Sequence, residues 1–532
     1  MHIVRSSSIV TASIGLISQS PDHTVRDINQ VEQCQRTSVA ILGAGVAGIT
    51  AAQTLSKHSF DDFLIVEYKN EIGGRMTHAE FGVHPDGRPY VVELGANWVQ
   101  GLGSEGGPEN PIWTLAKKWD VKNTYSDFDS LLTYNETGEV DYTNHFAAID
   151  GVYSSAEQTA GTILIENLQD RSARAGFSQA GWKPKKDMAA QAVEWWYWDF
   201  ESANPPDTSS FVFGIAGYNS THYQYSDENN FVHDERGFNY WLQGEASTFL
   251  RPNDTRLLLD TIVTNITYND RGVTVYNEDG SCISAEYALC TFSLGVLQNE
   301  AVTFEPKLPE WKQTGIETFH MGTYTKIFMQ FNETFWDAEK QFFLYADPNK
   351  RGYYPIFQSL SHENFMPGSN ILFVTVVGDE SYRIELQDDE TTQAEIMEVL
   401  RQMFPDITVP KPSAFMFPRW SLEPWAYGSY SNWPVGTTLE MHQNLRANVD
   451  RLWFAGEHTS AAYFGFLQGA YFEGREAGLR IASLLGNECV DQGRCGEHSF
   501  YDPLHGTTGR EAFNIINGWD ADSFATYGLN RE

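Results

Sequence analysis

The sequence feature that most constrains the fold is the segment GAGVAG at Gly43–Gly48, which has the pattern G-x-G-x-x-G. A strand-like run, SVAIL, precedes it, a helical pattern, VAGITAAQTLSKH, follows it, and the next strand-like run, FLIV, leads into Glu67. The glycines Gly43, Gly45 and Gly48 allow a tight turn and a close approach of the backbone to a pyrophosphate, which binds at the helix N-terminus. An acidic residue after the second strand hydrogen-bonds a ribose hydroxyl. The segment therefore predicts a Rossmann-like, dinucleotide-binding domain; the alternative for Glu67 is an ordinary surface charge.

The overall composition indicates a folded protein that attracts cations. The chain has 532 residues, enough for two or more domains, and 41% of them are hydrophobic, which excludes a disordered chain. Asp and Glu number 70 against 36 Lys and Arg, so the formal net charge is -34. This balance argues against nucleic acids and anionic membranes as partners, because both require a basic surface, and it favours cationic ligands. Plain solubility is the alternative explanation.

The two ends of the chain carry weaker signals. Residues 1–35 resemble a leader with the poor apolar region of a weak secretory signal, and the C-terminus, GLNRE, is not a peroxisomal signal. A secreted location is therefore favoured over a cytoplasmic one, and no apolar run approaches the roughly 20 residues of a membrane span. Cys489 and Cys495 are placed to close a small disulfide loop in an oxidising compartment. The 14 histidines form no HExxH pattern, so no metal site is predicted.

The middle of the chain alternates helical and strand patterns, which predicts a mixed α/β fold. A helix is expected within EQTAGTILIENLQD, another within TTQAEIMEVLRQMF and a last one over residues 469–485. Strands are expected at RLLLDTIVTNITYN, GVTVYN, AEYALCTF, TYTKIFMQF, QFFLYA, NILFVTVVG and RLWFAG.

The predicted strand MGTYTKIFMQF, residues 321–331, carries a lysine among aromatic residues. Because side chains alternate along a strand, Tyr324, Lys326 and Phe328 share one face, and Ile327 and Met329 share the other. An edge strand with its lysine in water is the simple explanation. A lysine buried among rings is the functional one, and its pKa would then be lowered.

Further segments make this sequence resemble a known family. Gly73-Gly74-Arg75 follows Glu67, VVELGANWVQG comes next, and LWFAGEHTS and YFGFLQG stand near the far end. This set, in this order, is similar to the flavin amine oxidases from about Thr37 to Leu485. The segments SDFD, SLGVLQ, PKLPEWK, RGYY and SNWPVG resemble the polyamine oxidases, particularly the plant type.

The resemblance implies FAD held by distant parts of the chain. Arg75 is expected at the phosphates, the backbone of Val263 at the adenine, and Glu457 near the ribityl chain; the alternative for Glu457 is a capping carboxylate. The full cofactor set implied is Gly43, Gly45, Gly48, Glu67, Arg75, Gly95, Ala96, Asn97, Trp98, Val263, Trp420 and Glu457.

The resemblance also implies an amine site in front of the flavin. Lys326 matches the lysine that holds a water against flavin N5, and Tyr324 matches a residue that lines the substrate tunnel. Tyr430 and Phe466 match two rings that flank the reacting amine. Trp98 and Gly465 complete the expected substrate contacts.

Four positions depart from the plant pattern, and two of them are Tyr430 and Phe466, where that pattern has Phe and Tyr. Glu201, in WDFESANPP, matches the glutamate offered to the polyamine, and it is expected to act with Lys326 and Tyr324 in catalysis. A second glutamate is expected after GANWV, where this chain has Gln100, and Ser202 replaces an aromatic residue. Gln100 still accepts a hydrogen bond but cannot pair with an ammonium. Weaker binding of a long polycation, or a different preferred amine, is therefore expected.

Together these observations predict an FAD-dependent amine oxidase that acts with oxygen on a small cationic amine, and a monomer is favoured. The alternatives are an oxidase of another amine or of an L-amino acid, for which Arg419 is a candidate carboxylate partner, and a non-catalytic binding protein on the same fold. The expected architecture is a Rossmann-like FAD-binding domain interleaved with a substrate domain of mixed sheet and helices. The expected boundaries are 36–120, 230–322 and 431–486 for the FAD domain, 121–229 and 323–430 for the substrate domain, and 487–532 for a tail.

Overall fold

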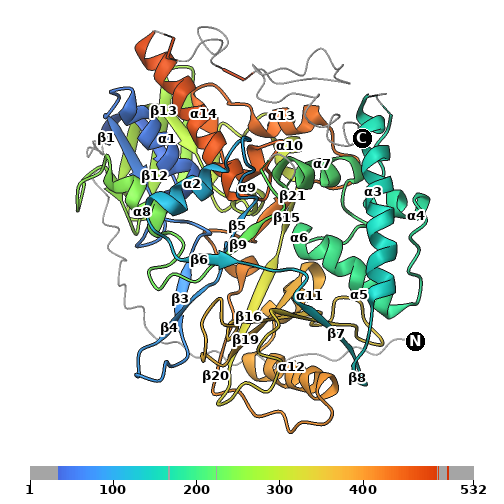
Figure 1. Cartoon of the computed structure of the whole chain (residues 1–532). Helices are drawn as coiled ribbons and strands as arrows, with labels where there is room; N and C mark the ends of the chain where they lie inside the picture. Colours follow the sequence, from blue (N-terminus) through green and yellow to red (C-terminus); the bar gives the residue numbers. More distant parts are fainter. Residues whose placement is uncertain (1–33, 166–167, 223–224, 488, 491–499, 502–532) are drawn as a thin grey trace, which may run out of the picture.

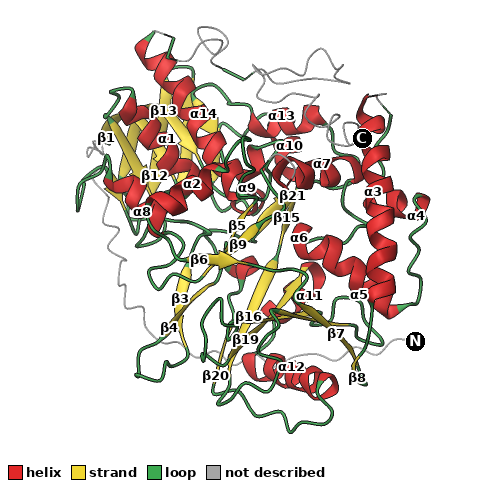
Figure 2. Cartoon of the chain, in the orientation of Figure 1, coloured by secondary structure: helices red, strands yellow, loops and turns green. Residues whose placement is uncertain are grey.

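The structure, a computed structural model, describes residues 34–165, 168–222, 225–487, 489–490 and 500–501. The predicted leader, except for its last residues, and most of the predicted tail lie outside the described residues. Within them the predicted mixed α/β fold is confirmed, with two large sheets and helices on their faces (Figures 1 and 2). No described helix has both the length and the apolar character needed to cross a membrane.

The larger sheet has eight strands and contains the predicted βαβ opening. Strand β1 lies between β2 and β13 and pairs with both in parallel, and β12 and β11 continue the sheet in antiparallel fashion. The strands are β1 (Gln35–Leu42), β2 (Phe63–Val66), β10 (Leu257–Leu258), β11 (Val263–Asn269), β12 (Gly272–Asn277), β13 (Cys282–Cys290), β14 (Thr303–Glu305) and β22 (Leu452–Phe454).

Both faces of β1 are buried, which explains its uninterrupted run of apolar residues. Val39 and Ile41 pack in one core with helices α1 (Val46–Lys57), α8 (Tyr240–Ser247) and α14 (Leu467–Gly486). Ala40 and Leu42 pack in another core, which reaches α9 (Leu294–Gln298), α10 (Glu310–Thr318) and α13 (Leu439–Arg446). Helices α1 and α14 pack so closely that a Cβ at Gly474 would lie 2.2 Å from the Ala47 carbonyl oxygen, so this contact requires glycine.

The second sheet has seven strands in the order β20-β16-β19-β18-β17-β7-β8. Ile327 and Met329 pack on one face in a core that includes α12 (Asp389–Met403), and Phe328 packs on the other, so the predicted alternation in this strand is confirmed. The strands are β7 (Leu131–Asn135), β8 (Gly138–Glu139), β16 (Tyr324–Gln330), β17 (Phe342–Tyr345), β18 (Ile356–Ser359), β19 (Ile371–Val377) and β20 (Ala414–Met416).

Smaller elements complete the fold. Helices α3 to α7 gather on the right of Figure 1, where α5 and α6 contact the seven-stranded sheet. The short strands are β3 (His78–Phe81), β4 (Tyr90–Glu93), β5 (Trp98–Gln100), β6 (Asn123–Tyr125), β9 (Asn229–Val232), β15 (His320–Gly322) and β21 (Tyr430–Asn432). The remaining helices are α2 (Pro111–Lys118), α3 (Thr143–Ile165), α4 (Ala173–Gln179), α5 (Met188–Glu194), α6 (Phe200–Ser202), α7 (Phe211–His222) and α11 (Gly378–Glu385), together with a π-helical turn (Trp195–Asp199) and 3-10 turns (Trp420–Leu422 and Glu457–Thr459).

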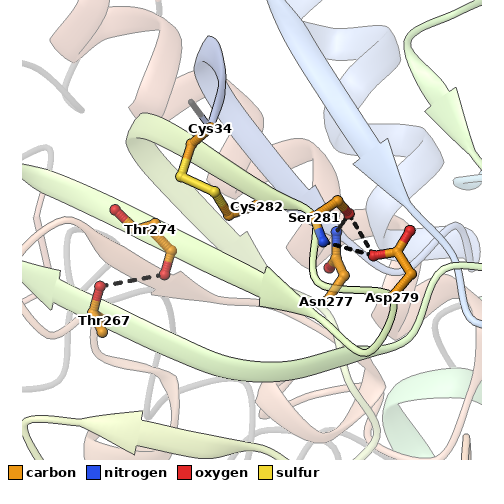
Figure 3. The surroundings of a disulfide bond; sticks show 7 residues. All are labelled: Cys34, Thr267, Thr274, Asn277, Asp279, Ser281 and Cys282. Atoms are coloured by element: carbon orange, nitrogen blue, oxygen red, sulfur yellow. Dashed lines mark hydrogen bonds between the residues drawn. A yellow bond between two sulfur atoms is a disulfide. The ribbon is translucent and has the colours of Figure 1, made fainter. Parts of the chain in front are cut away.

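A disulfide that the sequence did not predict joins Cys34 to Cys282 at the N-terminal ends of β1 and β13, two inner strands of the larger sheet (Figure 3). The register of the sheet explains it, because β1 and β13 run parallel with Gln35 opposite Ile283, which places the two cysteines side by side. Cys489 also takes part in a disulfide. Cys495, its predicted partner, lies outside the described residues.

Candidate active site

One cavity of about 530 Å³ brings together most of the predicted site residues. It begins at the turn between β1 and α1 and reaches the neighbourhood of α6 and α7. Of the predicted residues, those that line it are Gly43, Gly45, Glu67, Arg75, Gly95, Ala96, Asn97, Trp98, Gln100, Glu201, Val263, Tyr324, Trp420, Tyr430, Glu457, Gly465 and Phe466. We call the part near Gly43 the inner end and the part near Glu201 the outer end.

The glycine turn at the inner end leaves no room for larger residues at two of its positions. Gly43 has a φ of +113°, which favours glycine, and a Cβ at Gly48 would meet the Gly43 carbonyl oxygen at 1.9 Å. Gly48 is therefore structural and does not line the cavity. At Gly45 a Cβ would meet only the Gly74 Cα, at 4.0 Å, and the N-terminus of α1 has no side-chain cap. The free N–H groups of a helix N-terminus suit a phosphate.

Glu67 is buried at the end of β2 and is held by the backbone. The Ala44 N–H donates to one carboxylate oxygen at 2.7 Å, and the Lys69 N–H donates to the other at 2.9 Å. Burial raises the pKa of Glu67, and the two backbone donors oppose that effect. The alternative of an exposed surface charge is wrong, since only 5% of Glu67 is exposed.

Arg75 and Glu457 form an ion pair across the cavity wall between segments that are far apart in the sequence. Arg75 Nη1 donates to Glu457 Oε1 at 2.8 Å and to the Ser429 carbonyl at 2.9 Å. Glu457 also accepts from the Ser431 hydroxyl at 2.6 Å and from the Gly465 N–H at 2.8 Å. Burial acts to raise the pKa of this carboxyl, but Arg75 and the other donors outweigh it and hold the pKa below its ordinary value.

The Gly95–Trp98 segment forms the wall between this ion pair and Lys326. A Cβ at Gly95 would meet the Arg75 carbonyl oxygen at 1.7 Å, so glycine is required there. The Trp420 ring lies 3.4 Å from that same Cβ position. Asn97 is buried and donates to the Val232 carbonyl at 2.9 Å.

Lys326 lies behind this wall. Its Nζ donates to the Gly95 carbonyl at 2.8 Å and to Asn97 Oδ1 at 2.9 Å. The edge-strand alternative is wrong, because β16 pairs with both β19 and β20 and only 1% of Lys326 is exposed. Lys326 does not line the cavity itself, but its two hydrogen-bond partners, Gly95 and Asn97, do.

The charge state of Lys326 is coupled to a buried carboxyl that the sequence analysis missed. Burial lowers the pKa of Lys326 to about 7, as the lysine-among-rings hypothesis predicts, and the charge of Glu93 acts in the opposite direction. Burial in turn raises the pKa of Glu93 to about 7. Glu93 ends β4 and accepts a hydrogen bond from the Phe238 N–H at 2.6 Å. The sequence feature that could have identified Glu93 was its position two residues before Gly95.

Aromatic rings enclose the outer half of the cavity. The rings of Tyr324 and Tyr430 lie 6.0 Å apart between centroids, and Phe200 lies 5.8 Å from Tyr324. The Tyr430 hydroxyl donates to the Glu201 carbonyl at 2.8 Å. Phe466 lines the same region. These rings can orient an amine through their faces and exclude water.

At the outer end the structure brings Gln100 and Glu201 into contact. Gln100 Nε2 donates to the two carboxylate oxygens of Glu201 at 3.1 and 3.3 Å. His222, which the sequence analysis missed, has its Nε2 4.0 Å from Glu201 Oε1. The one sequence feature that could have identified His222 is helical spacing, because it lies four residues after Tyr218, which lines the first cavity. The predicted catalytic carboxylate is thus held by an amide and lies near an imidazole.

A second cavity of about 750 Å³ opens beyond the outer end and shares Gln100 and Glu201 with the first. Among the described residues that line it there is no lysine or arginine, and six carry carboxylates: Asp129, Glu139, Asp141, Asp150, Glu201 and Asp227. Such a passage attracts cations and repels anions. The described residues contain no cluster of Cys, His, Asp and Glu suited to a metal ion.

Arg419, the candidate partner of an amino-acid carboxylate, does not line either cavity. It donates to the Glu385 and Gln387 carbonyls and pairs with Asp389 at 2.6 Å. Among the described residues that line the first cavity, Arg75 is the one arginine or lysine, and it is paired with Glu457. The site therefore suits an amine better than an amino acid.

Comparison with known proteins agrees with this geometry. Polyamine oxidase 1 of Zea mays is 39% identical over 479 residues, which cover 86% of this chain and 92% of that protein. Polyamine oxidase 7 of Oryza sativa subsp. japonica is 39% identical over 456 residues, which cover 82% and 93% of the two chains. A solved structure of putrescine oxidase with bound putrescine has the same fold, with a TM-score of 0.66 at 14% identity, and covers 85% of this chain and 100% of its own.

A family model described as flavin containing amine oxidoreductase matches residues 46–482. This range contains the glycine turn, the ion pair, Lys326 and the outer end. With relatives 39% identical over most of both chains, it shows that the chain belongs to the flavin-containing amine oxidoreductases and uses a flavin to oxidise an amine.

Proposed function

We propose that this chain is an FAD-dependent polyamine oxidase that acts on spermine, spermidine or their acetylated forms. The observation that carries the proposal is one cavity that joins a dinucleotide-type turn to an outer end with aromatic rings and a carboxylate. The relatives named polyamine oxidases in Zea mays and Oryza sativa support the substrate class. The acidic second cavity supports a cationic substrate.

The residues at the inner end fit FAD. The uncapped N-terminus of α1 and the clearance at Gly45 suit a pyrophosphate, and Glu67 stands where a ribose hydroxyl would be bound. A cavity of about 530 Å³ is within the usual range for a cofactor site. Arg75 and Glu457 would fix the segments around the middle of the cofactor, and Val263 and Trp420 would contact it from the walls. Bound FAD supplies the acceptor for the C–H hydride beside an unprotonated amine and passes the electrons to oxygen, which gives hydrogen peroxide.

The residues of the chain position the amine and manage protons. Glu201 attracts an ammonium of the substrate to the outer end. Tyr324, Tyr430 and Phe466 orient the reacting nitrogen and exclude water. Burial lowers the pKa of Lys326, which favours its neutral form, so that it can exchange a proton with a water held at the Gly95 and Asn97 wall of the cavity. A water on the cavity side of that wall would serve in the hydrolysis of the imine product to an aldehyde and a smaller amine.

A second candidate is an oxidase of a different amine. The specific observation is that Gln100 occupies the place of an expected glutamate and is already engaged with Glu201. One carboxylate attracts one ammonium, so a shorter amine such as a diamine would be preferred over spermine. We keep the polyamine class as the proposal and make this preference a part of the test.

We also propose the domain boundaries and the compartment. Apart from Gln35, the first residue of β1, the strands of the eight-stranded sheet fall within residues 36–120, 230–322 and 431–486, and those of the seven-stranded sheet fall within 121–229 and 323–430. This supports an FAD domain and a substrate domain with those limits. The Cys34–Cys282 disulfide supports an oxidising compartment such as the cell exterior.

The test is anaerobic mixing of the purified yellow protein with spermine, spermidine and N-acetylated spermidine, monitored by the visible flavin absorbance. Bleaching by at least one of them, with hydrogen peroxide released when air is admitted, is the expected result. A yellow protein that stays oxidised with all three would contradict the polyamine assignment and favour another amine. Heat release and mass determination of the cofactor distinguish FAD from other flavins.

A further inference from the structure

His222 is a buried imidazole whose Nε2 has no hydrogen-bond partner in the described part of the chain. It is the last residue of α7, and 4% of its side chain is exposed. It lines the second cavity, and its Nε2 makes no hydrogen bond to any described residue. Buried polar groups nearly always have a partner, so this nitrogen indicates a place for a ligand or water.

Neighbouring rings fix the direction in which His222 faces. Its ring lies 4.2 Å from the Tyr218 ring at an interplanar angle of 36°, one helical turn earlier. The Phe466 ring, which lines the first cavity, lies 6.3 Å away at 78°. These contacts keep Nε2 directed to Glu201, and the 4.0 Å between Nε2 and Oε1 is slightly too long for a hydrogen bond. A third group that bonds both is thereby favoured.

The carboxylates that line the second cavity are the charged groups nearest to His222. Of the helices that pack against α7, α3 also carries His145, which pairs with Asp187, and α4 carries Arg174, which pairs with Glu194. Glu201 faces it from α6, Asp227 lines the same cavity from the segment before β9, and α3, which packs against α7, carries Asp150 and Glu157. The titratable hydroxyls that line this cavity are Tyr142, Tyr197 and Tyr218. No lysine or arginine among the described residues lines it. A protonated His222 is therefore the one cation that this part of the protein can place beside Glu201.

We propose that His222 determines which amines the outer end accepts, by sharing Glu201 with the substrate. This inference rests on the proposed polyamine oxidase function. Neutral, and with its proton on Nδ1, His222 accepts a hydrogen bond at Nε2 from the ammonium that Glu201 binds. Protonated, it pairs with Glu201 and competes with that ammonium. Amine affinity at the outer end therefore depends on whether His222 carries a charge.

The same pairing sets the selectivity. Gln100 gives Glu201 no charge, so the outer end has one negative charge for one ammonium when His222 is neutral. With His222 protonated the Gln100–Glu201–His222 group has no net charge, and the advantage of a free terminal ammonium over an acetylated one disappears. The site then discriminates between charged and acetylated polyamines while His222 is neutral, and it loses that discrimination when His222 is protonated.

The test measures binding in the holoenzyme with its flavin kept reduced and oxygen excluded, so that spermidine binds without turnover. Calorimetry gives the Kd for spermidine and for N-acetylated spermidine, and the protons released on binding, at about pH 5.5 and about pH 7.5. The variants are His222→Gln, which cannot be protonated, and His222→Phe, which keeps the ring contacts. The control is His233→Gln, since His233 lies outside both cavities and its Nε2 is 2.9 Å from Thr124 Oγ1.

For each His222 variant we compare its Kd for spermidine with that of wild type at both pH values. We expect the ratio of the wild-type Kd to the variant Kd to be at least about fivefold larger at the lower pH. Titrations of other groups occur in wild type and variant alike, so they cancel in this ratio. Wild type and His233→Gln release protons on binding in acid, and both His222 variants release fewer. Equal pH slopes and equal proton release in wild type and both His222 variants would overturn the inference alone. A wild type that neither binds nor oxidises polyamines at either pH would overturn the proposed function and this inference with it.

Discussion

Two carboxylates that line one cavity, Glu457 and Glu201, have opposite surroundings. Glu457 has 6% of its side chain exposed and accepts hydrogen bonds from Arg75, Ser431 and Gly465. Glu201 has 27% of its side chain exposed and accepts only the long bonds from Gln100 among the side-chain contacts described.

The difference separates groups that build the cavity from groups that wait for a substrate. A buried carboxylate whose donors are all supplied by the protein cannot exchange them without a large loss of free energy. A carboxylate at the outer end with little compensation gains by binding an ammonium. Removal of Glu457 should therefore affect the fold and the cofactor, and removal of Glu201 should affect substrate affinity.

The largest effect is expected for Glu457→Ala. It leaves the Arg75 guanidinium without its carboxylate and deprives the Ser431 and Gly465 donors of their acceptor, so the free energy of unfolding should fall by about 3–5 kcal/mol and the flavin should be lost. Urea unfolding and the ratio of flavin to protein check this. Glu286→Ala removes an exposed partner of Arg451 and should cost less than about 1 kcal/mol. A Glu457→Ala protein as stable and as yellow as wild type would remove the distinction between the two carboxylates.

Lys326→Met should lower kcat by about 10²- to 10⁴-fold with the flavin retained, because it removes a proton-transfer group and keeps the volume. Lys312→Met is a matched control. Lys312 is also fully buried, and its Nζ donates to the Leu445 and Ala447 carbonyls, but it lines neither cavity. This control should lose stability and keep its turnover per bound flavin. Near-normal turnover in Lys326→Met would exclude the proposed role of this lysine.

Glu201→Gln should lower kcat/KM for spermidine by about tenfold, since one charge-assisted contact at a partly exposed site is lost. Stability and flavin content should not change, in contrast to Glu457→Ala. Steady-state peroxide assays check this, with Glu398→Gln on the exposed face of α12 as the control. If Glu201→Gln also loses its flavin, the outer end is part of the scaffold and the comparison fails.

Gln100→Glu should raise the preference for spermine over spermidine by about three- to tenfold, because a second carboxylate pairs with a second ammonium. Without substrate the two adjacent carboxylates repel each other when both are ionised, so the variant should melt at a lower temperature than wild type. Competition kinetics and melting curves measure these changes. If the preference for spermine over spermidine is the same in Gln100→Glu as in wild type, the amide of Gln100 does not set the substrate preference.

The smallest effect is a shift in pH dependence. If neutral Lys326 is the active form, kcat falls as the pH drops through about 7. Glu93→Gln removes the negative charge that stabilises the ammonium, so it lowers the pKa of Lys326 and moves this fall to lower pH by about one unit. The amide can keep the bond to the Phe238 N–H. Glu80→Gln, exposed on β3, should leave the profile unchanged, and an unchanged or raised inflection in Glu93→Gln would refute the coupling.

The sequence by itself determined the parts of the site that depend on neighbouring residues. The glycine turn, α1 and Glu67 follow from a local pattern, because backbone freedom at glycine and the periods of strands and helices are short-range properties. The faces of β16 followed from the same alternation. The resemblance of ordered segments led further, to Arg75, Glu457 and Lys326, although it did not say what each one contacts.

Tertiary structure decided which charges and thiols meet. Arg75 pairs with Glu457, Gln100 with Glu201, and Cys34 with Cys282, and each pair joins residues that are far apart in the sequence. His222 is marked only by its helical spacing from Tyr218. Lys326 is buried because β19 pairs with its strand and the distant Gly95–Asn97 segment lies against its ammonium group. Burial and pairing depend on which segments the fold brings together, and a pKa or an affinity depends in turn on burial and pairing. Local pattern placed the groups on their elements, and only the packing of the two sheets gave them their surroundings.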